Sequence, residues 1–238
     1  NEGDGFFRDE SYATGSGKVS LPLLGFGTNF LDFDLDGRLD LFVANGHVLD
    51  NAEQIDQSTT YRQPDLLLHN QGPGEYGTTT FVDVASEAGP GFARPGVGRG
   101  SAIGDYDADG DPDILVIHLG AAPALLRNDG PTGNWLRVRT TGTTSNCAGV
   151  GTRIELFSEG GQQIREIRAG SSYQSQSELP AHFGLGSAAK IGELVVYWSS
   201  GAVDTLHDIL PNQTLALEEG RHREPARSPA AGNKDSGR

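Results

Sequence analysis

The sequence predicts an all-β protein, a partial β-propeller followed by a small antiparallel β domain. Glycine is frequent, at 34 of 238 residues, and separates short apolar runs, a pattern typical of many strands joined by turns. One stretch occurs twice, as "LGFGTNFLDFDLDGRLDLFVAN" at 24–45 and "VGRGSAIGDYDADGDPDILVIH" at 97–118. After residue 133 this repetition stops, and several segments alternate apolar and polar residues with period two.

The repeated unit has a fixed order of parts: an Asp-rich loop, two strands, an Asn-x-Gly turn and a further strand. The strands are expected at 39–45, 65–70 and 78–84 in the first unit, and at 112–118 and 124–128 in the second. Units of about four short strands at this spacing are typical of propeller blades. Residues 1–133 are therefore expected to form about two and a half blades, and upstream blades to be missing, because propellers close with about 4–8.

Three other segments complete the predicted organisation. Residues 46–63 are polar and are expected to form a surface insertion between strands. Residues 134–219 are expected to form the small β domain, with strands in "NWLRVRTTG", "GTRIELFS", "QQIREIRAG", "ELVVYWSSG" and "QTLALEEG". Residues 220–238 are rich in Pro, Ala, Gly, Lys and Arg and are expected to be a disordered tail.

Charge and composition argue against a nucleic-acid-binding protein and against a membrane-spanning helix. The net charge is −14, and residues 1–133 alone carry 7 Lys/Arg against 21 Asp/Glu, a balance of −14. Such an acidic surface repels phosphate backbones and attracts cations. No apolar run approaches the ~18 residues of a membrane helix. The single cysteine, Cys147, cannot form a disulfide within the chain.

The two Asp-rich loops follow the pattern D-x-D-x-D-G-x-x-D. Side chains at positions one, three, five and nine converge when the loop curls, glycine at position six permits a sharp turn, and the carbonyl of position seven can point inward. The predicted ligands are Asp32, Asp34, Asp36, the Arg38 carbonyl and Asp40 in the first loop, and Asp105, Asp107, Asp109, the Asp111 carbonyl and Asp113 in the second. All are hard oxygen donors, so about two structural Ca²⁺ ions are predicted.

Other interpretations of the loops are less well supported. An EF-hand requires Glu at position twelve, where this chain has Val43 and Val116 inside predicted strands. Neither loop contains Cys or His, which disfavours zinc. The remaining alternative is an Asp-rich turn that holds no metal. Four carboxylates at close quarters would then repel one another by roughly 1 kcal/mol or more per pair.

These motifs resemble known families. "GDYDADGDPDILV" followed by "LLRNDG" resembles the FG-GAP/VCBS repeats of integrin-like propellers. "GSSYQSQS", "HFGLG" and "ELVVYWSSG" resemble the ASPIC/UnbV domain that follows such repeats in the cartilage acidic protein family and its bacterial relatives. The two resemblances together cover roughly residues 1–219.

The resemblance implies a seven-bladed propeller with calcium in its loops and an extracellular, periplasmic or cell-surface location. It also implies a binding or adhesion role, and some labels of the family say RNA-binding. We expect a non-enzymatic module that binds a protein or a glycan. Two features depart from the family: a basic residue usually stands where this chain has Cys147, and the blades are too few to close a ring.

Two alternative functions have weaker support in the sequence. A hydrolase acting at the propeller mouth would need a nucleophile and base, but "GSSYQSQS" (170–177) lies near His182 without a G-x-S-x-G elbow. A structural turn is the simpler interpretation of that segment, although exposed polar loops also serve as recognition surfaces. Nucleic-acid (RNA) binding by the second domain would use its arginines, yet acidic residues are interspersed among them.

Overall fold

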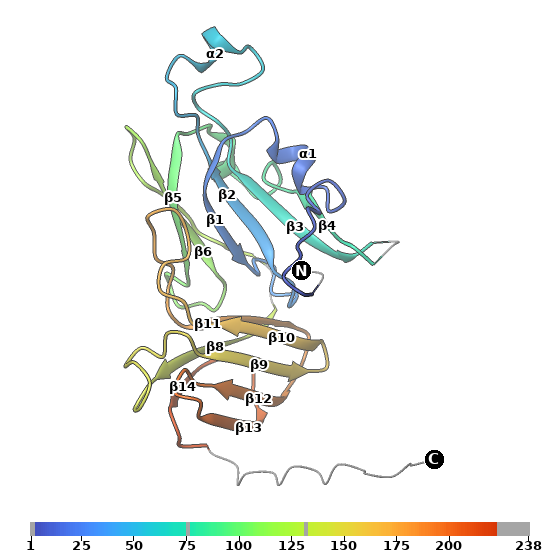
Figure 1. Ribbon diagram of the computed structural model, residues 1–238, viewed down its shortest axis with the longest axis vertical. Coiled ribbons are helices and arrows are strands. Elements are labelled where there is room, and N and C mark those ends of the chain that lie inside the picture. The colour runs from blue at the N-terminus through green and yellow to red at the C-terminus, as the bar shows by residue number, and fades with distance from the viewer. Residues whose placement is uncertain (1–2, 75–76, 131–132, 223–238) are drawn as a thin grey trace.

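The chain is almost entirely β-structure. The computed structural model describes residues 3–74, 77–130 and 133–222. Figure 1 shows two parts stacked along the long axis, with β1–β7 above and β8–β14 below. This confirms the predicted all-β, propeller-type architecture with a second β unit. Among the described residues, no helix is long and apolar enough to cross a bilayer.

The upper part consists of two sheets, and the strands of each sheet lie side by side in chain order, as in two successive propeller blades. The first sheet runs β1 (Gly25–Leu31), β2 (Asp40–Asn45), β3 (Leu66–Pro73) and β4 (Thr79–Asp83), and the second runs β5 (Gly98–Gly104), β6 (Asp113–His118) and β7 (Ala124–Leu126). All neighbouring strands in both sheets are antiparallel. The two Asp loops connect β1 to β2 and β5 to β6, so each joins the first two strands of its blade.

The two blades pack face to face through one apolar core. Its buried members are Leu31, Phe42, Ala44, Leu67, Ala85, Ile114 and Val116. The innermost strands are also joined by polar contacts, because the buried Asn29 on β1 donates to the hydroxyl of Ser101 on β5 at 2.7 Å. The blades therefore form one packed unit although the ring is not closed.

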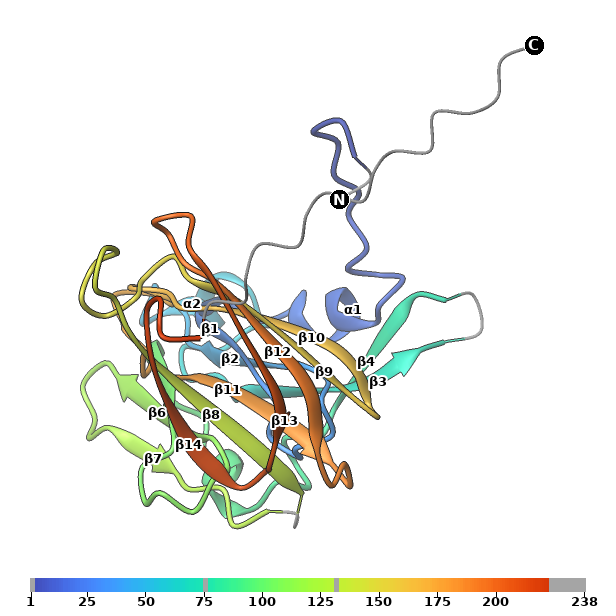
Figure 2. The same cartoon turned by 90° about the horizontal axis from the view of Figure 1, so that it is seen from below.

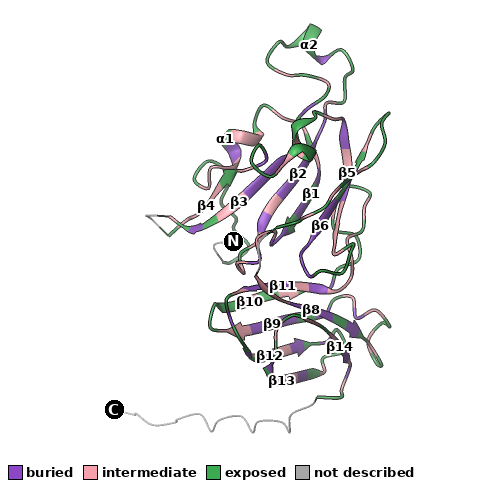
Figure 3. Ribbon diagram, turned by 180° about the vertical axis from the view of Figure 1, so that it is seen from behind, coloured by how far each residue is buried: buried purple, intermediate pink, exposed green. Residues whose placement is uncertain are grey.

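Two short helical segments lie outside these sheets. Helix α1 (Ser16–Ser20) belongs to the N-terminal segment, and its Val19, together with the following Leu23, packs against the cluster of Val43, Leu66 and Leu68 on the first blade. The insertion 46–63 carries α2 (Ala52–Ile55), projects from the top of the molecule and is largely exposed, as expected (Figure 3). A short 3-10 turn, η1 (Pro90–Ala93), precedes β5.

The lower part is built from two sheets around a second core. One sheet has the order β10 (Gly161–Glu166), β9 (Arg153–Ser158), β12 (Ile191–Tyr197) and β13 (Val203–Ile209), and the other β11 (Ala181–Gly186), β8 (Asn134–Thr141) and β14 (Gln213–Glu218). Figure 2 shows β8 and β14 side by side. These two strands are parallel, which departs from the expected purely antiparallel domain because the last strand returns beside the first in the same direction. Of the predicted disordered tail, 220–238, the first three residues are described, and the amides of Gly220 and His222 donate to Asp204 at 2.7 and 2.8 Å. Residues 223–238 lie outside the described residues.

The "GSSYQSQS" motif joins the two parts. Its hydroxyls cap the inner strands of both blades: Ser172 accepts from the Thr28 amide at 3.0 Å, and Ser177 accepts from the Ile103 amide at 3.1 Å. The ring of Tyr173 packs edge-on against Phe26 at 5.1 Å between centroids. The motif is therefore a structural contact, as the simpler interpretation predicted, and it anchors the lower part to β1 and β5.

Candidate metal centre

The two Asp loops share one backbone shape. In each loop positions four and six have positive φ: Leu35 at 60° and Gly37 at 94°, then Ala108 at 62° and Gly110 at 103°. A left-handed conformation at a non-glycine residue costs roughly 1–2 kcal/mol, so both loops are held in a curled form that their sequences alone do not favour. In the first loop the side chain of Leu35 is only 2% exposed, which helps to fix the curl.

The aspartate at position nine ties each loop to the next part of its blade. Asp40 accepts from the amides of Phe33 at 3.1 Å and Asn70 at 2.8 Å. Asp113 makes the same two bonds, with Tyr106 at 2.7 Å and Asn128 at 2.8 Å. The Asn-x-Gly turn of each repeated unit thus positions the carboxylate that closes its own loop.

Three carboxylates converge in each loop. One oxygen each of Asp32, Asp34 and Asp40 lie within 4.8 Å of one another, and Asp105, Asp107 and Asp113 form the matching group. Positions one, three and nine therefore come together as the spacing predicts. Position five joins neither group: Asp36 clusters with Asp34 and His69 instead, and Asp109 accepts from the Asp111 amide at 3.2 Å.

The position-seven residues have different surroundings in the two loops. The side chain of Arg38 pairs with Asp36 and donates to the Asn70 carbonyl at 2.9 Å. The side chain of Asp111 is buried, and its Oδ1 has no hydrogen-bond partner among the described residues. Burial, followed by the negative charge of the neighbouring Asp109, raises the pKa of Asp111 to about 7.

Burial also disfavours the charged form of two carboxyl groups in the first loop. It raises the pKa of Asp32 to about 7, although the Gly37 amide lowers it, and it raises the pKa of Asp40 to about 7 against the Asn70 and Phe33 amides. Asp32 is 2% exposed, and its Oδ1 has no hydrogen-bond partner in the described part of the chain. A buried carboxylate oxygen without a donor is costly, and a divalent cation at this point would remove that cost.

The donor set fits calcium. Every converging group in the two three-aspartate clusters is a carboxylate, and flexible loops of this type complete the 6–8 oxygen ligands of Ca²⁺ with carbonyls and water. Asp32, Asp34 and Asp40 would hold the ion in the first loop, and Asp105, Asp107 and Asp113 in the second. In the first loop the ion would supply positive charge beside Asp32 and Asp40, the two carboxyls whose pKa burial raises.

The lower part reaches both loops. Arg137 on β8 contacts Asp105 at 3.0 Å, and the Asp105 side chain is 1% exposed. His182 on β11 donates from Nε2 to the Gly110 carbonyl at 2.8 Å, and burial lowers the pKa of His182 to about 4, which keeps the ring neutral. At the first loop, the Gly186 amide donates to the Leu35 carbonyl at 2.7 Å. Both loops therefore lie at the junction of the two parts.

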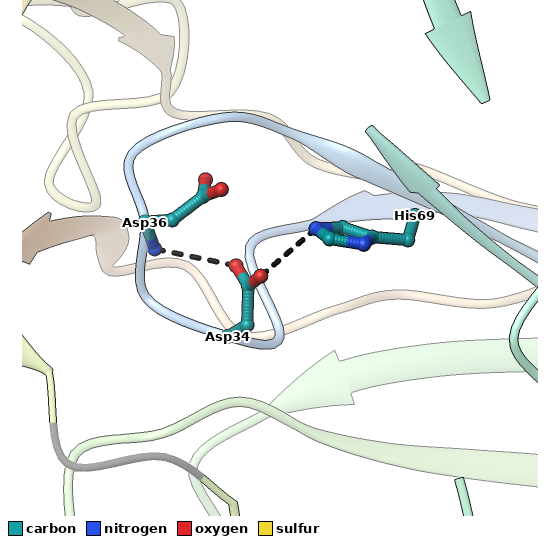
Figure 4. A group of neighbouring side chains, drawn as sticks. All are labelled: Asp34, Asp36 and His69. Atoms are coloured by element: carbon teal, nitrogen blue, oxygen red, sulfur yellow. Dashed lines mark hydrogen bonds and ion pairs between the residues drawn. The ribbon is translucent and has the colours of Figure 1, made fainter. Parts of the chain in front are cut away.

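Sequence reasoning missed His69 because it looked for ligands only within each loop. His69 lies on β3, 2.9 Å through Nε2 from Oδ2 of Asp34 (Figure 4). The signal was present in the alignment of "LLLHNQG" with "ALLRNDG", which places His69 where the second unit has Arg127. Arg127 indeed contacts the equivalent aspartate, Asp107, at 3.5 Å.

Comparison with known families agrees with this geometry. Residues 32–116 match the FG-GAP-like repeat family, a span that begins with the first Asp loop and includes the second. Residues 142–224 match the family described as ASPIC and UnbV. The chain joins an FG-GAP-like repeat region to an ASPIC and UnbV domain.

Three curated relatives are each 27% identical to the chain and are named cartilage acidic protein 1. The Xenopus tropicalis protein aligns over 86% of this chain and 38% of its own length, the Homo sapiens protein over 78% and 26%, and the Mus musculus protein over 71% and 25%. The chain thus spans between a quarter and two-fifths of the length of these relatives.

Proposed function

We propose that the chain is a calcium-stabilised extracellular binding module that recognises a protein or a glycan and is not an enzyme. The observation that supports this most is the pair of Asp loops with the same curled backbone, each with three converging carboxylates. Because both loops lie between the blades and the ASPIC and UnbV domain, bound calcium would stiffen the surface that the two parts present together.

The families matched are not enzyme families, which supports a binding role. The candidate catalytic groups also have structural contacts. His182 donates to a backbone carbonyl of the second loop, and the hydroxyls of Ser172 and Ser177 accept from strand amides. The relatives named for cartilage, together with the family resemblance, support an extracellular location.

The arginines of the ASPIC and UnbV domain give little support to nucleic-acid binding. Arg137 bridges Asp105 and Glu178, and Arg153 pairs with Glu155 at 2.6 Å. Arg165 donates to the His182 carbonyl at 3.0 Å. These side chains are engaged within the protein, so a protein or glycan ligand is the better proposal for a chain of net charge −14.

The proposal is tested by probing an array of extracellular proteins and glycans with the chain in calcium and in EDTA. A ligand bound in calcium, and lost both in EDTA and in the double variant Asp34→Ala/Asp107→Ala, supports it. The control Asp50→Ala changes an exposed aspartate of the insertion and should bind as the wild type does. Ligand binding that is identical in EDTA, or RNA binding with a steep salt dependence, would refute the proposal.

A further inference from the structure

A cleft lies between the first blade and the ASPIC and UnbV domain. Its volume is about 540 Å³. Ligand sites typically measure ~300–1,000 Å³ and often lie where two domains meet. The first blade lines the cleft with β1, and the second domain lines it with β10 and with residues 177–182, at the junction visible in Figure 1. The cleft therefore has the size and the position of a binding site.

Part of the cleft wall is apolar and open to solvent. Phe30 on β1 is 61% exposed, and Ile164 on β10 is 45% exposed. Leu179 and Pro180 are half-buried and line the same cleft. Large apolar side chains left open in a cleft favour a ligand that has an apolar group of its own.

Several polar side chains that line the cleft already have partners. The Ser171 hydroxyl donates to Ser177 at 3.0 Å, and Glu166 pairs with Arg168 at 3.0 Å. Glu178 pairs with the arginine of β8 that also contacts the second loop. A sugar ring with hydroxyls on all sides would find few free partners here, so a peptide fits this cleft better than a glycan does.

Arg165 has donors to spare. Three of its five N–H groups donate to neutral acceptors: the carbonyls of His182 and Ile164, both at 3.0 Å, and Oε1 of Gln163 at 3.1 Å. One N–H on each terminal nitrogen remains. Burial lowers the pKa of Arg165 to about 10, against the opposing effect of Asp32, so the guanidinium is charged at pH 7. No acid forms an ion pair with it in the described structure, which favours a carboxylate as its ligand.

The first Asp loop acts on this arginine. The acidic group whose charge reaches Arg165 is Asp32, which also lines the cleft and belongs to the three-carboxylate group predicted to hold calcium. Calcium in that group would take up the charge of Asp32 and leave Arg165 more positive toward the cleft. A carboxylate in the cleft should therefore bind more tightly in calcium than in EDTA.

We propose that this cleft binds a peptide segment of the protein ligand in which an acidic residue stands next to an aliphatic one. Arg165 receives the carboxylate, and Phe30 and Ile164 contact the aliphatic side chain. The net charge of −14 repels a polyanion, but a single carboxylate feels mainly the nearby charges, because salt screens those beyond ~8 Å. The inference rests on the proposed function, since it assumes a protein ligand that is bound in calcium.

The test is a calorimetric titration of the full chain, in calcium and in EDTA, with the capped peptide acetyl-Gly-Leu-Glu-Gly-amide. The same peptide with Gln in place of Glu is the matched probe, and it should bind the wild type about tenfold more weakly because it lacks the carboxylate. Arg165→Gln should remove the preference for the Glu peptide.

A pair of isoleucine variants tests the cleft without touching the arginine. Ile164→Asp places a like charge beside the bound carboxylate and should weaken binding of the Glu peptide about tenfold. Ile117→Asp, on the second blade outside the cleft and with the same 45% exposure, should leave binding unchanged. If Arg165→Gln fails to fold, this pair decides the inference.

The outcomes separate this inference from the calcium proposal, because calcium binding is measured on the same proteins. A preference for the Glu peptide that is lost in Ile164→Asp, with calcium binding and melting temperature retained, supports the inference. The same result in a protein that binds no calcium supports the cleft and refutes the calcium role. Equal binding of the two peptides by the wild type, binding unchanged in Ile164→Asp, or binding of glucuronate but not of the peptide overturns the inference.

Discussion

At the scale of single residues, Arg137 links the ASPIC and UnbV domain to the second Asp loop. Its side chain is 14% exposed and contacts both Asp105 and Glu178. Burial raises the pKa of Asp105, and Arg137 lowers it, so the arginine is the main protein group that favours the charged form of this acid. Calcium in the second loop would provide a second source of positive charge.

Arg137→Gln should therefore destabilise the calcium-free protein more than the calcium-bound protein. Removing one partner from a mostly buried ion pair costs roughly 2–4 kcal/mol, and calcium should recover part of that loss. Urea unfolding with calcium and with EDTA measures the difference. Arg153→Gln, which removes the half-exposed arginine that pairs with Glu155, should cost about 1 kcal/mol or less in both conditions. Equal losses for Arg137→Gln with and without calcium would contradict the account.

Glu219 is a second residue whose side chain holds a loop in place. It is 4% exposed, and one carboxylate oxygen accepts from the amides of Thr143, Thr144 and Ser145 at 2.7–2.8 Å. The other oxygen accepts from the hydroxyl of Ser200. Burial would raise the pKa of Glu219, but these donors outweigh it and lower the pKa from 4.5 to about 2. The charged carboxylate thus organises the loop after β8.

A lowered pKa in the folded state adds stability above the unfolded value of 4.5, and this stability is lost as pH falls toward 2. Glu219→Gln should lower the melting temperature at pH 7 and reduce the loss of stability between pH 4.5 and 2. Melting curves across this range measure it, with the exposed Glu159→Gln as the matched control. An unchanged acid dependence in Glu219→Gln would count against this role.

At the scale of elements, the strands that could be predicted are those with a clear run of apolar side chains. β2 and β6 follow the Asp loops as largely apolar runs, "LFVAN" and "ILVIH", and lie where predicted. β1 and β5 were not identified as strands because glycine is a poor strand former. The structure explains one of these glycines: a Cβ at Gly27 would meet the Arg99 carbonyl at 2.6 Å, so the inner strands approach too closely for a side chain.

The candidate site was predictable within each loop and not beyond it. The spacing of D-x-D-x-D-G-x-x-D is local, so it revealed that Asp32, Asp34 and Asp40 would converge. The contacts of His69 and Arg137 depend on how β3 and the second domain pack, which no spacing within the loops encodes. Likewise, apolar and polar residues alternate too weakly in β13 for its pairing with β12 to be predicted from the sequence.

The junction segment 170–178 gives a prediction at the same scale. Ser177→Ala removes the acceptor of the Ile103 amide, and an unpaired amide at a packed junction costs about 1–3 kcal/mol. Chemical denaturation of the variant should show this loss, whereas Ser187→Ala, at an exposed hydroxyl, should be neutral within about 0.5 kcal/mol. Equal stabilities of the two variants would show that the segment does not hold the parts together.

At the scale of the whole molecule, both Asp loops lie where the blades meet the second domain. The domain contacts the first loop through Gly186 and the second through Arg137 and His182. Calcium bound in the loops would therefore stabilise the blades and their junction with the second domain together. Ions that bind only the folded state add stability by mass action, about 2.7 kcal/mol per site at 100 times the dissociation constant.

The measurement that tests this most directly is a calcium titration by calorimetry, with melting curves in calcium and in EDTA, on the wild type and on Asp107→Ala. We expect about two ions per wild-type chain, about one in the variant, and a lower melting temperature in EDTA. No calcium binding, with the same melting temperature in calcium and EDTA, would contradict the account and leave the Asp loops as turns without a metal.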